Sequence, residues 1–259
     1  MLMPRKCYAK KLDEIAGLDA YKVISVTGSG GKTSMLYALG KYFAKAGRAV
    51  ITTTTKIYSP KARECGNIVL GTPAECAEKI AALPEHSLSA AARGKAPEGK
   101  LAGFRPEEVD ALLELGVADM MIVEADGARG LSFKCYEDWE PPVPQSTQCQ
   151  LVMFGADALL KPVSAETIFR TDLLKERYGV QKNETLSAAN AMAVLANKYE
   201  YLKNSPDGAS RVLCVNKCEL LMPEQRKELL DNLKDNLINY DAAILCSISD
   251  NEIFDTIKF

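Results

Sequence analysis

The stretch that decides the fold is VTGSGGKTS, residues 26–34. It closes an apolar, β-branched run, YKVISVT at residues 21–27, that predicts a buried strand, and it opens a helix predicted over residues 32–46. A glycine-rich turn in this position is typical of a phosphate-binding loop, because glycine adopts the positive φ angles that let the backbone close around an anion. We therefore predict a loop that binds phosphate groups through the following residues: Gly28, Ser29, Gly30, Gly31, Lys32, Thr33 and Ser34.

The spacing of this loop is that of the shorter pattern G-x-x-G-K-[ST], from Gly28 to Thr33. Val26 stands where the longer common pattern, G-x-x-x-x-G-K-[ST], requires glycine. We expect the amides of the turn and of the first helical turn to point at the phosphates, aided by the helix dipole. Lys32 would reach the β- and γ-phosphates, and the Thr33 hydroxyl would ligate Mg²⁺. The competing interpretation is a glycine-rich turn whose Ser or Thr only caps a helix.

Strands and helices alternate along the rest of the chain. Further strands are predicted at residues 49–55, around Val69, and at 120–123, 151–155, 211–217 and 242–247, and further helices at 72–82, 105–116 and 223–237. This alternation predicts an α/β fold, a three-layer, P-loop NTPase-like single domain over residues 1–259 with a mostly parallel sheet and helices on both faces. Residues 84–104 are expected to form an exposed hairpin or loop insertion, and residues 164–204 a helical segment.

Composition and charge narrow the class of protein. The 259 residues include 32 Lys and Arg against 34 Asp and Glu, a net charge of −2, so we expect no nucleic-acid partner. No apolar run approaches the roughly 18 residues of a membrane span, and MLMPRKCYAKK lacks the apolar stretch of a secretory signal. These observations predict a cytoplasmic protein that does not bind membranes.

The cysteines and the histidine exclude several kinds of site. Eight cysteines occur without a C-x-x-C pair, and His86 is the single histidine. We expect reduced, buried thiols rather than a disulfide scaffold or a zinc site. One histidine also makes a Ser-His-Asp or Cys-His hydrolase improbable.

Two acids end a predicted apolar strand. The segment MMIVEADG places Glu124 and Asp126 two residues apart, so that both side chains face the same side of the strand. A P-loop nucleotide site needs a carboxylate near its metal at the end of a neighbouring strand. We therefore predict that Glu124 or Asp126, together with Thr33, holds Mg²⁺, and the sequence leaves open which acid is nearer. The alternative is that Asp126 and Gly127 only form a turn.

Polar and basic residues follow two of the predicted strands. Residues 52–55 are all threonine and are followed by Lys56. A threonine hydroxyl or this lysine could touch the γ-phosphate or Mg²⁺, as a switch loop does. The alternative is that the threonines only form a strand, in which threonine is common because of its branched Cβ. Arg129 and Lys134 follow the acids and could sense the γ-phosphate or hold an anionic substrate. A solvated basic loop is the alternative for these two residues.

A short motif after the predicted strand at 211–217 suggests a contact with a nucleotide base. Asn216, Lys217 and Glu219 resemble the N-K-x-D motif of GTP-binding proteins, in which the carboxylate accepts hydrogen bonds from guanine. Here the acid is glutamate, one methylene longer, which weakens the preference for guanine. The nucleotide is therefore ATP or GTP.

Together these segments resemble the YqeC-like family, described as accessory proteins of selenium-dependent molybdenum hydroxylases. The resemblance covers residues 21–249 and rests on TGSGGKTS, TTTTK, VEADGARG with Lys134, EPPVP, GADALLKPV, Arg170 and VNKCE. The phosphate loop is also similar to the G-T-x-G-K-T-T loop of Mur ligases, whose other domains are absent. Phe169 stands before Arg170 where we expect histidine in the family, which weakens any proton-transfer role there.

The resemblance implies a nucleotide-dependent step in maturing a molybdenum hydroxylase, such as selenium insertion or cofactor handling. We expect a Mg²⁺-dependent NTPase in which Lys32, Glu124 and Asp126 are catalytic and water is the acceptor. One alternative is a small-molecule kinase or ligase that uses the phosphate loop and clamps its substrate with residues 129–134. Another is a nucleotide-gated switch that docks a partner such as the hydroxylase or its cofactor-maturation proteins.

Two of the cysteines carry a further hypothesis. Cys135 or Cys218 could carry selenium during maturation. The oligomeric state is left open.

Overall fold

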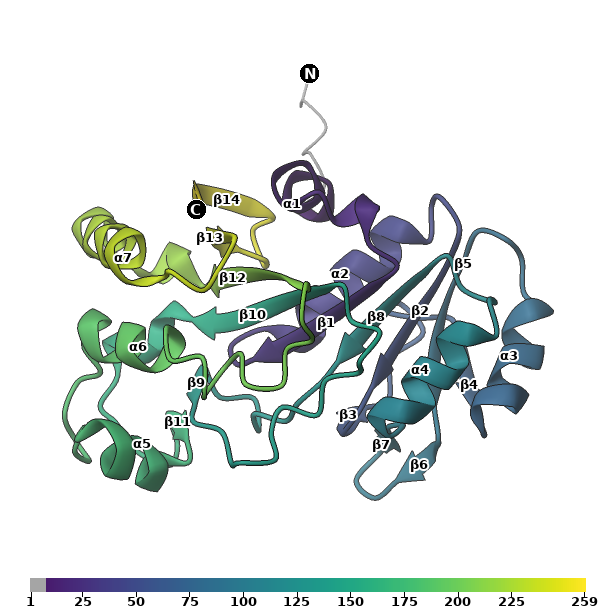
Figure 1. Cartoon of the computed structure of the whole chain (residues 1–259), viewed down its shortest axis with the longest axis horizontal. Helices are drawn as coiled ribbons and strands as arrows, with labels where there is room; N and C mark the ends of the chain where they lie inside the picture. The colour runs from purple at the N-terminus through teal and green to yellow at the C-terminus, as the bar shows by residue number, and fades with distance from the viewer. Residues whose placement is uncertain (1–7) are drawn as a thin grey trace.

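A computed structural model describes residues 8–259 of the chain. Residues 1–7 lie outside the described residues, and they include Cys7 and most of the segment considered for a secretory signal. Nine strands form one sheet in the order β14-β13-β12-β10-β1-β8-β2-β5-β4, shown in Figure 1. All neighbouring strands are parallel except the pair β13 and β14. The strands of this sheet are β1 (Val23–Gly28), β2 (Arg48–Thr53), β4 (Asn67–Leu70), β5 (Ser87–Ala92), β8 (Met120–Glu124), β10 (Cys149–Gly155), β12 (Ser210–Asn216), β13 (Ala242–Ser247) and β14 (Glu252–Lys258).

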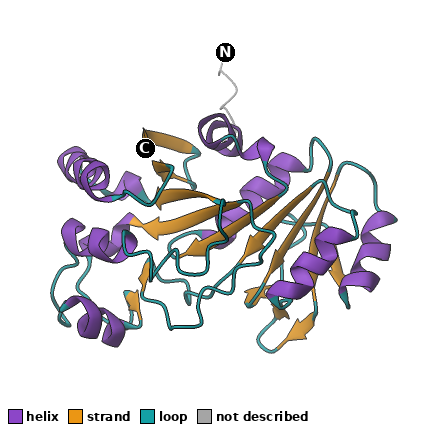
Figure 2. Ribbon diagram, viewed as in Figure 1, coloured by secondary structure: helices purple, strands orange, loops and turns teal. Residues whose placement is uncertain are grey.

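Helices cover both faces of the sheet (Figure 2). They are α1 (Tyr8–Ala16), α2 (Lys32–Phe43), α3 (Pro73–Ala81), α4 (Pro106–Glu114), α5 (Thr171–Tyr178), α6 (Ala188–Leu195) and α7 (Pro223–Asn236). Alternate side chains of each strand separate the layers: Met120 and Ile122 of β8 pack with α1 and α2, whereas Met121 and Val123 pack with α3 and α4. Helices α5 to α7 cover the same face as α3 and α4, over β10, β12 and β13. The predicted three-layer α/β fold with a mostly parallel sheet is confirmed.

The expectation for residues 84–104 is partly wrong. Residues Ser87–Ala92 form β5, a strand inside the main sheet between β2 and β4. Its sequence, SLSAAA, lacks the β-branched residues that signal a strand, but its alanines are buried in the core clusters on both faces of the sheet. Only β6 (Gly94–Ala96) and β7 (Lys100–Ala102) form the expected hairpin, which pairs with β3 (Lys56–Tyr58) in a small second sheet.

The segment at residues 164–204 is helical only in part. It contains α5, α6 and a short strand, β11 (Ile168–Phe169), that pairs with β9 (Phe133–Lys134). The pattern SAANAMAVLANKYEYL yields a helix only over Ala188–Leu195, with turns after it. Tyr201 and Leu202, which continued the helical pattern, are instead buried in the core beneath α5 to α7. Apolar periodicity alone cannot distinguish a helix from turns that bury the same residues.

The cysteines of the described part of the chain are free and buried. Burial raises the pKa of Cys149 and of Cys246 to about 12. No helix within residues 8–259 has the length and apolar character to cross a membrane.

The connectivity of the sheet fixes where a ligand can bind. Strand β1 lies at the centre, between β8 and β10. The strands on the β8 side all come from residues 48–124 and those on the β10 side from residues 149–258, so the chain changes direction at β1. Ligands of such sheets bind at the carboxyl ends of the strands at this switch point. The loop after β1 occupies that position.

Replacing Ile122 by alanine tests the central position of β8. The side chain is fully buried, so Ile122→Ala should lower the free energy of unfolding by about 2 to 5 kcal/mol in urea denaturation. Ile238→Ala is the matched control, because Ile238 is 84% exposed and its loss should change stability by no more than about 0.5 kcal/mol. Equal effects of the two variants would contradict this placement.

Candidate functional site

The loop between β1 and α2 packs tightly against the end of β10. Gly28 and Gly30 have φ angles of +88° and +80°. A Cβ at Gly28 would overlap the backbone of Met153, and one at Gly30 would overlap Gly155. Glycine is therefore required at both positions by close backbone approach as well as by conformation.

The amides of this loop divide into two groups. Those of Gly28, Ser29 and Gly30 already have acceptors in the protein, including the carbonyls of Met153 at 2.8 Å from Ser29 and Leu131 at 3.0 Å from Gly30. Within the described chain, the amides of residues 31–34, at the start of α2, have no acceptor. We expected the amides of the whole turn to face an anion. Only the amides at the N-terminus of α2 are free to do so, and there the helix dipole adds to their attraction for an anion.

Lys32 lies behind the loop rather than in solvent. Its ammonium donates to the carbonyl of Gly28 at 2.6 Å and forms an ion pair with Asp126 at 2.9 Å, and the side chain is almost fully buried. In this conformation the ammonium of Lys32 is therefore held by the loop itself and by Asp126.

Asp126 is a fully buried carboxylate with several charged and polar partners. Besides Lys32, it accepts hydrogen bonds from the Gly28 amide at 2.8 Å and from the Tyr136 hydroxyl, and Lys134 lies 3.5 Å away. Burial by itself would raise the pKa of Asp126, but the two ammonium groups and the Tyr136 hydrogen bond outweigh it and hold the pKa below its usual value. The geometry thus gives Asp126 a role in holding the loop.

Glu124 faces the start of α2 instead. At the end of β8 it accepts a hydrogen bond of 2.8 Å from the hydroxyl of Thr33. Burial raises the pKa of Glu124, although Lys32 and the Thr33 hydrogen bond act in the opposite direction. The structure therefore separates the two acids that the sequence left equivalent, and only Glu124 contacts the threonine.

The donor set at Thr33 and Glu124 fits a hard cation. Mg²⁺ prefers oxygen ligands and is commonly held by one or two carboxylates plus substrate phosphates. Within residues 8–259 no group of three or more His, Cys, Asp or Glu side chains could hold a metal by itself. A magnesium ion here would therefore complete its coordination with water and with the oxygens of a bound substrate.

A buried ionic chain leads away from Asp126. Lys134 lies 3.7 Å from Glu140, and Glu140 in turn pairs with Arg170. The rings of Tyr136 and Phe169 lie against the Lys134 ammonium, at 4.1 and 5.6 Å from their centroids. Sequence reasoning assigned no role to Tyr136 or Glu140, because nothing in the local pattern marks residues that fold back onto a distant carboxylate.

Of the three predicted base-contact residues, only Asn216 contacts the loop. The amide group of Asn216 donates to the Gly30 carbonyl at 2.8 Å and accepts from the Ile248 amide at 2.9 Å. Lys217 bonds the Ser132 hydroxyl at 2.7 Å and pairs with Asp157. Glu219 Oε2 is buried and has no hydrogen-bond partner among the described residues, which leaves it as an unsatisfied acceptor.

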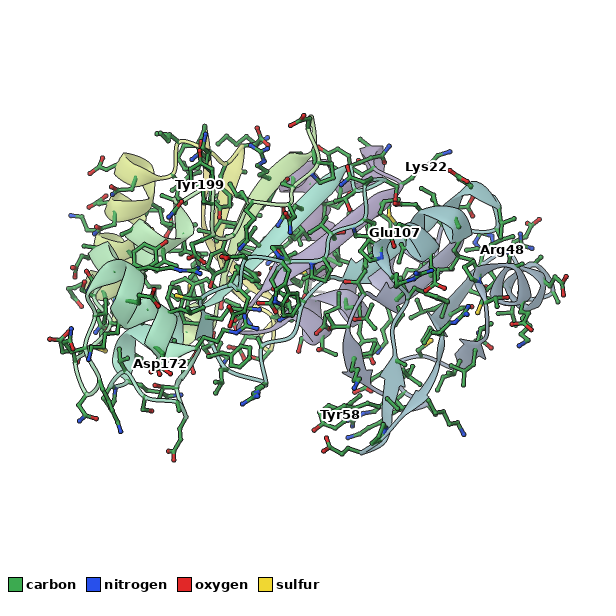
Figure 3. All side chains as sticks on the ribbon, turned by 60° about the horizontal axis from the view of Figure 1, so that its bottom comes forward. Lys22, Arg48, Tyr58, Glu107, Asp172 and Tyr199 are labelled. Carbon is green, nitrogen blue, oxygen red and sulfur yellow. The ribbon has the colours of Figure 1, made fainter. Side chains whose placement is uncertain are left out.

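The threonine segment is largely structural. The Thr52 hydroxyl donates to the Ala91 carbonyl, and the Thr53 hydroxyl donates to the carbonyl of Glu124 at 2.7 Å. Lys56 begins β3 and is exposed. The Thr54 amide donates to the Glu124 carbonyl at 3.1 Å, two residues before the small sheet of β3, β7 and β6 begins. Figure 3 shows Tyr58 of β3 on this small sheet.

Neither cysteine proposed to carry selenium is accessible. Cys135 and Cys218 are fully buried. Burial raises the pKa of Cys135 to about 12 and also raises the pKa of Cys218, so that neither thiolate forms readily at neutral pH in this conformation.

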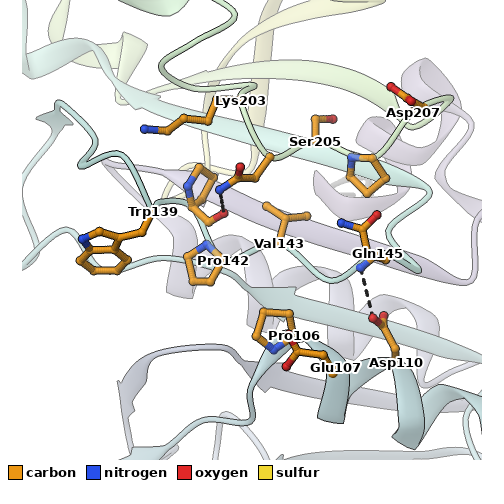
Figure 4. A pocket seen from close by; sticks show the side chains of 13 residues that line it. Pro106, Glu107, Asp110, Trp139, Pro142, Val143, Gln145, Lys203, Ser205 and Asp207 are labelled. Atoms are coloured by element: carbon orange, nitrogen blue, oxygen red, sulfur yellow. Dashed lines mark hydrogen bonds between the residues drawn. The ribbon is translucent and has the colours of Figure 1, made fainter.

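An open groove of about 490 Å³ lies elsewhere on the molecule (Figure 4). It runs between the start of α4 and two loops, and it contains none of the predicted site residues; its lining includes Pro106, Glu107, Trp139, Pro142, Val143 and Lys203. Trp139, at one end, lies 6.0 Å from the guanidinium of Arg170, which joins the groove to the ionic chain.

Fold and site together define a class: a three-layer α/β protein with a phosphate-loop-type turn at the switch point of its parallel sheet. A sequence profile of the YqeC protein family matches residues 24–172. The chain is also 33% identical over 223 residues to a protein of Escherichia coli strain K12 named "Uncharacterized protein YqeC", with 80% of this chain and 84% of the relative covered. The chain belongs to the YqeC family, so the resemblance inferred from its motifs is confirmed.

Gly30→Ala tests the tight packing of the loop. A left-handed φ costs a non-glycine residue about 1 to 2 kcal/mol, and at Gly30 the added methyl also meets Gly155. The variant should therefore lose more unfolding free energy in urea than Gly130→Ala, where φ is +77° but nothing lies within 4 Å of the added Cβ. If the two variants lose the same stability, the close approach to β10 does not exist.

The two acids should respond to pH in opposite ways. Because burial raises the pKa of Glu124 in the fold, its ionisation costs stability once the pH exceeds the unfolded value of about 4.3. Glu124→Gln should therefore raise Tm at pH 7 and leave it unchanged below about pH 4.

Asp126→Asn is the matched comparison. The depressed pKa of Asp126 stabilises the fold above the unfolded value of about 3.9, and this stabilisation is lost as the pH falls through the lower folded value. At pH 7 the variant leaves Lys32 and Lys134 without their shared carboxylate, so it should lose about 3 to 5 kcal/mol. Calorimetry at both pH values checks the pair, and a shift of the same sign for both variants at pH 7 contradicts the assignment.

Proposed function

We propose that this protein is a Mg²⁺-dependent nucleotide-binding protein that hydrolyses ATP or GTP. The observation that supports this proposal most directly is the contact between the hydroxyl of Thr33 and the carboxylate of Glu124, at the N-terminus of α2 and the switch point of the sheet. A phosphate-loop threonine beside a carboxylate from a neighbouring strand is the pair that P-loop NTPases use at their metal.

Each residue of the loop has a distinct task in this proposal. The free amides of residues 31–34 and the dipole of α2 bind the phosphates. Lys32 exchanges its contacts with Gly28 and Asp126 for phosphate oxygens. Thr33 and Glu124 would hold Mg²⁺, which supplies charge neutralisation and orientation of the phosphates when bound. Asp126 remains behind the loop, paired with Lys134 and Tyr136.

The end of β12 would accommodate the base. Glu219 has an unsatisfied buried acceptor oxygen, and the hydrogens on N1 and N2 of guanine are donors of the kind that such an oxygen accepts. Asn216 and Lys217 are occupied by the protein, and Asn216 positions the phosphate loop instead.

The physiological role that we propose follows from the family resemblance. Turnover would serve the maturation of a selenium-dependent molybdenum hydroxylase, which would be the partner. The partner and the chemistry of the loop are independent of each other, so nucleotide binding, turnover and the effect of the hydroxylase are measured separately.

Thermal unfolding with ATP or GTP, each with Mg²⁺, tests nucleotide binding. Ligand at 100 times its dissociation constant stabilises a protein by about 2.7 kcal/mol, which for this size corresponds to a rise in Tm of about 5 to 10 °C. Lys32→Ala should abolish the shift. Phosphate release, measured alone and with the hydroxylase added, then tests turnover and the partner.

Lys41→Ala is the matched control, because Lys41 lies on the same helix and is exposed. It should retain the full shift. If neither nucleotide stabilises the wild-type protein, the proposal fails. Tight binding without phosphate release under any condition would instead favour the switch, and release that requires a small acceptor would favour a kinase or ligase.

A further inference from the structure

Arg129 has no carboxylate partner, whereas other cations near the site each pair with a carboxylate. Lys32 pairs with Asp126, Lys134 pairs with Asp126 and Glu140, and Arg170 pairs with Glu140. Arg129 is exposed and forms no ion pair with any residue of the described chain. Its charge is therefore available to an anion from solution.

The backbone places the turn that carries Arg129 next to the phosphate loop. The Leu131 amide donates to the Ala128 carbonyl at 2.9 Å, which closes a four-residue turn with Arg129 and Gly130 at its centre. The carbonyl of Leu131 accepts the amide of Gly30 at 3.0 Å. The turn that carries Arg129 is thus hydrogen-bonded to the loop that precedes α2.

Arginine is an unfavourable residue at this position of the turn. Arg129 and Gly130 have φ angles of +51° and +77°, the pattern of a type I′ turn, which prefers Gly, Asn or Asp at both central positions. A left-handed conformation crowds the Cβ of any other residue. Strained non-glycine residues of this kind cluster at ligand sites, where the side chain compensates for the backbone.

The guanidinium of Arg129 lies against the ring of Phe169. Arg129 lies 4.9 Å from the ring centroid, and the paired Arg170 lies 4.6 Å from it. A stacked guanidinium keeps its N–H donors free at the edge of its plane, where they match the oxygens of a phosphoryl group. The aromatic residue that replaces the expected histidine therefore has a positioning role.

We propose that Arg129 binds the terminal phosphoryl group of a nucleoside triphosphate held by the phosphate loop, and that Phe169 positions it. This inference rests on the proposed function, since it requires a nucleotide at the loop. It adds discrimination between nucleoside triphosphate and diphosphate, because only the triphosphate presents the group that Arg129 contacts.

Isothermal titration with Mg²⁺ and either the triphosphate or the diphosphate of the preferred base tests the inference. Arg129→Ala should weaken triphosphate binding roughly ten- to hundred-fold, the size of a lost hydrogen bond to a charged group, and change diphosphate binding by less than about twofold. Lys32→Ala should weaken both nucleotides. Phe169→Leu leaves the charge of Arg129 in place but removes the ring that it lies against. This variant should lose part of the preference for the triphosphate over the diphosphate.

Arg129→Gly separates a ligand contact from a structural role. Glycine relieves the left-handed strain, so this variant should raise Tm without nucleotide while it loses triphosphate binding as Arg129→Ala does. A lower Tm together with weaker binding would show a structural role and overturn the inference. Arg63→Ala, at an exposed arginine after β3, is the matched control and should change neither quantity.

The remaining outcomes are also decisive. Equal weakening of triphosphate and diphosphate by Arg129→Ala, or no change in either, overturns the inference and leaves the proposed function intact. A third titration adds inorganic phosphate to the diphosphate complex. If Arg129→Ala changes only this phosphate binding, the residue serves a separate anion and the assignment is overturned. If the wild-type protein binds neither nucleotide, the proposed function fails, and this inference fails with it.

Discussion

The buried carboxylate of Asp126 is the group on which the site depends. It joins the end of β1, through the Gly28 amide, to the first residue of α2, through the Lys32 ammonium. It also joins them to the segment after β8, through Lys134 and Tyr136. A fully buried anion is tolerable only when charge and hydrogen bonds compensate for lost hydration, and here two ammonium groups, an amide and a hydroxyl do so. The shape of the loop between β1 and α2 is consistent with that requirement.

The same requirement explains why the two acids of VEADG differ. Two carboxylates cannot both occupy the space behind Lys32, and the strand end directs Glu124 toward Thr33 instead. Glu124 is left buried with fewer compensating partners, and its pKa rises where that of Asp126 falls. Burial disfavours the ionised form of Glu124 when no ligand is present. Of the two acids, Glu124 is therefore the one that a bound cation is expected to stabilise more.

The sequence predicted the frame of the molecule well. The strand, turn and helix predicted at residues 21–46 located the loop. The alternation of strands and helices predicted the layers and the parallel sheet. Strand β5 escaped prediction, because it is held by backbone pairing with β2 and β4 rather than by an intrinsic strand preference of its alanines. The helical pattern over residues 164–204 misled for a related reason, since Tyr201 and Leu202 are buried from a turn.

What the sequence determined by itself is local: a glycine turn between strand and helix, the acids that end a neighbouring strand, and the motifs that identify the family. Tertiary structure alone decided which acid faces Thr33, that Lys32 is held behind the loop, and that Phe169 lies against Arg129. These are contacts between residues far apart in the chain. Their geometry follows from burial and charge compensation around Asp126, and neither quantity is written in the spacing of nearby residues.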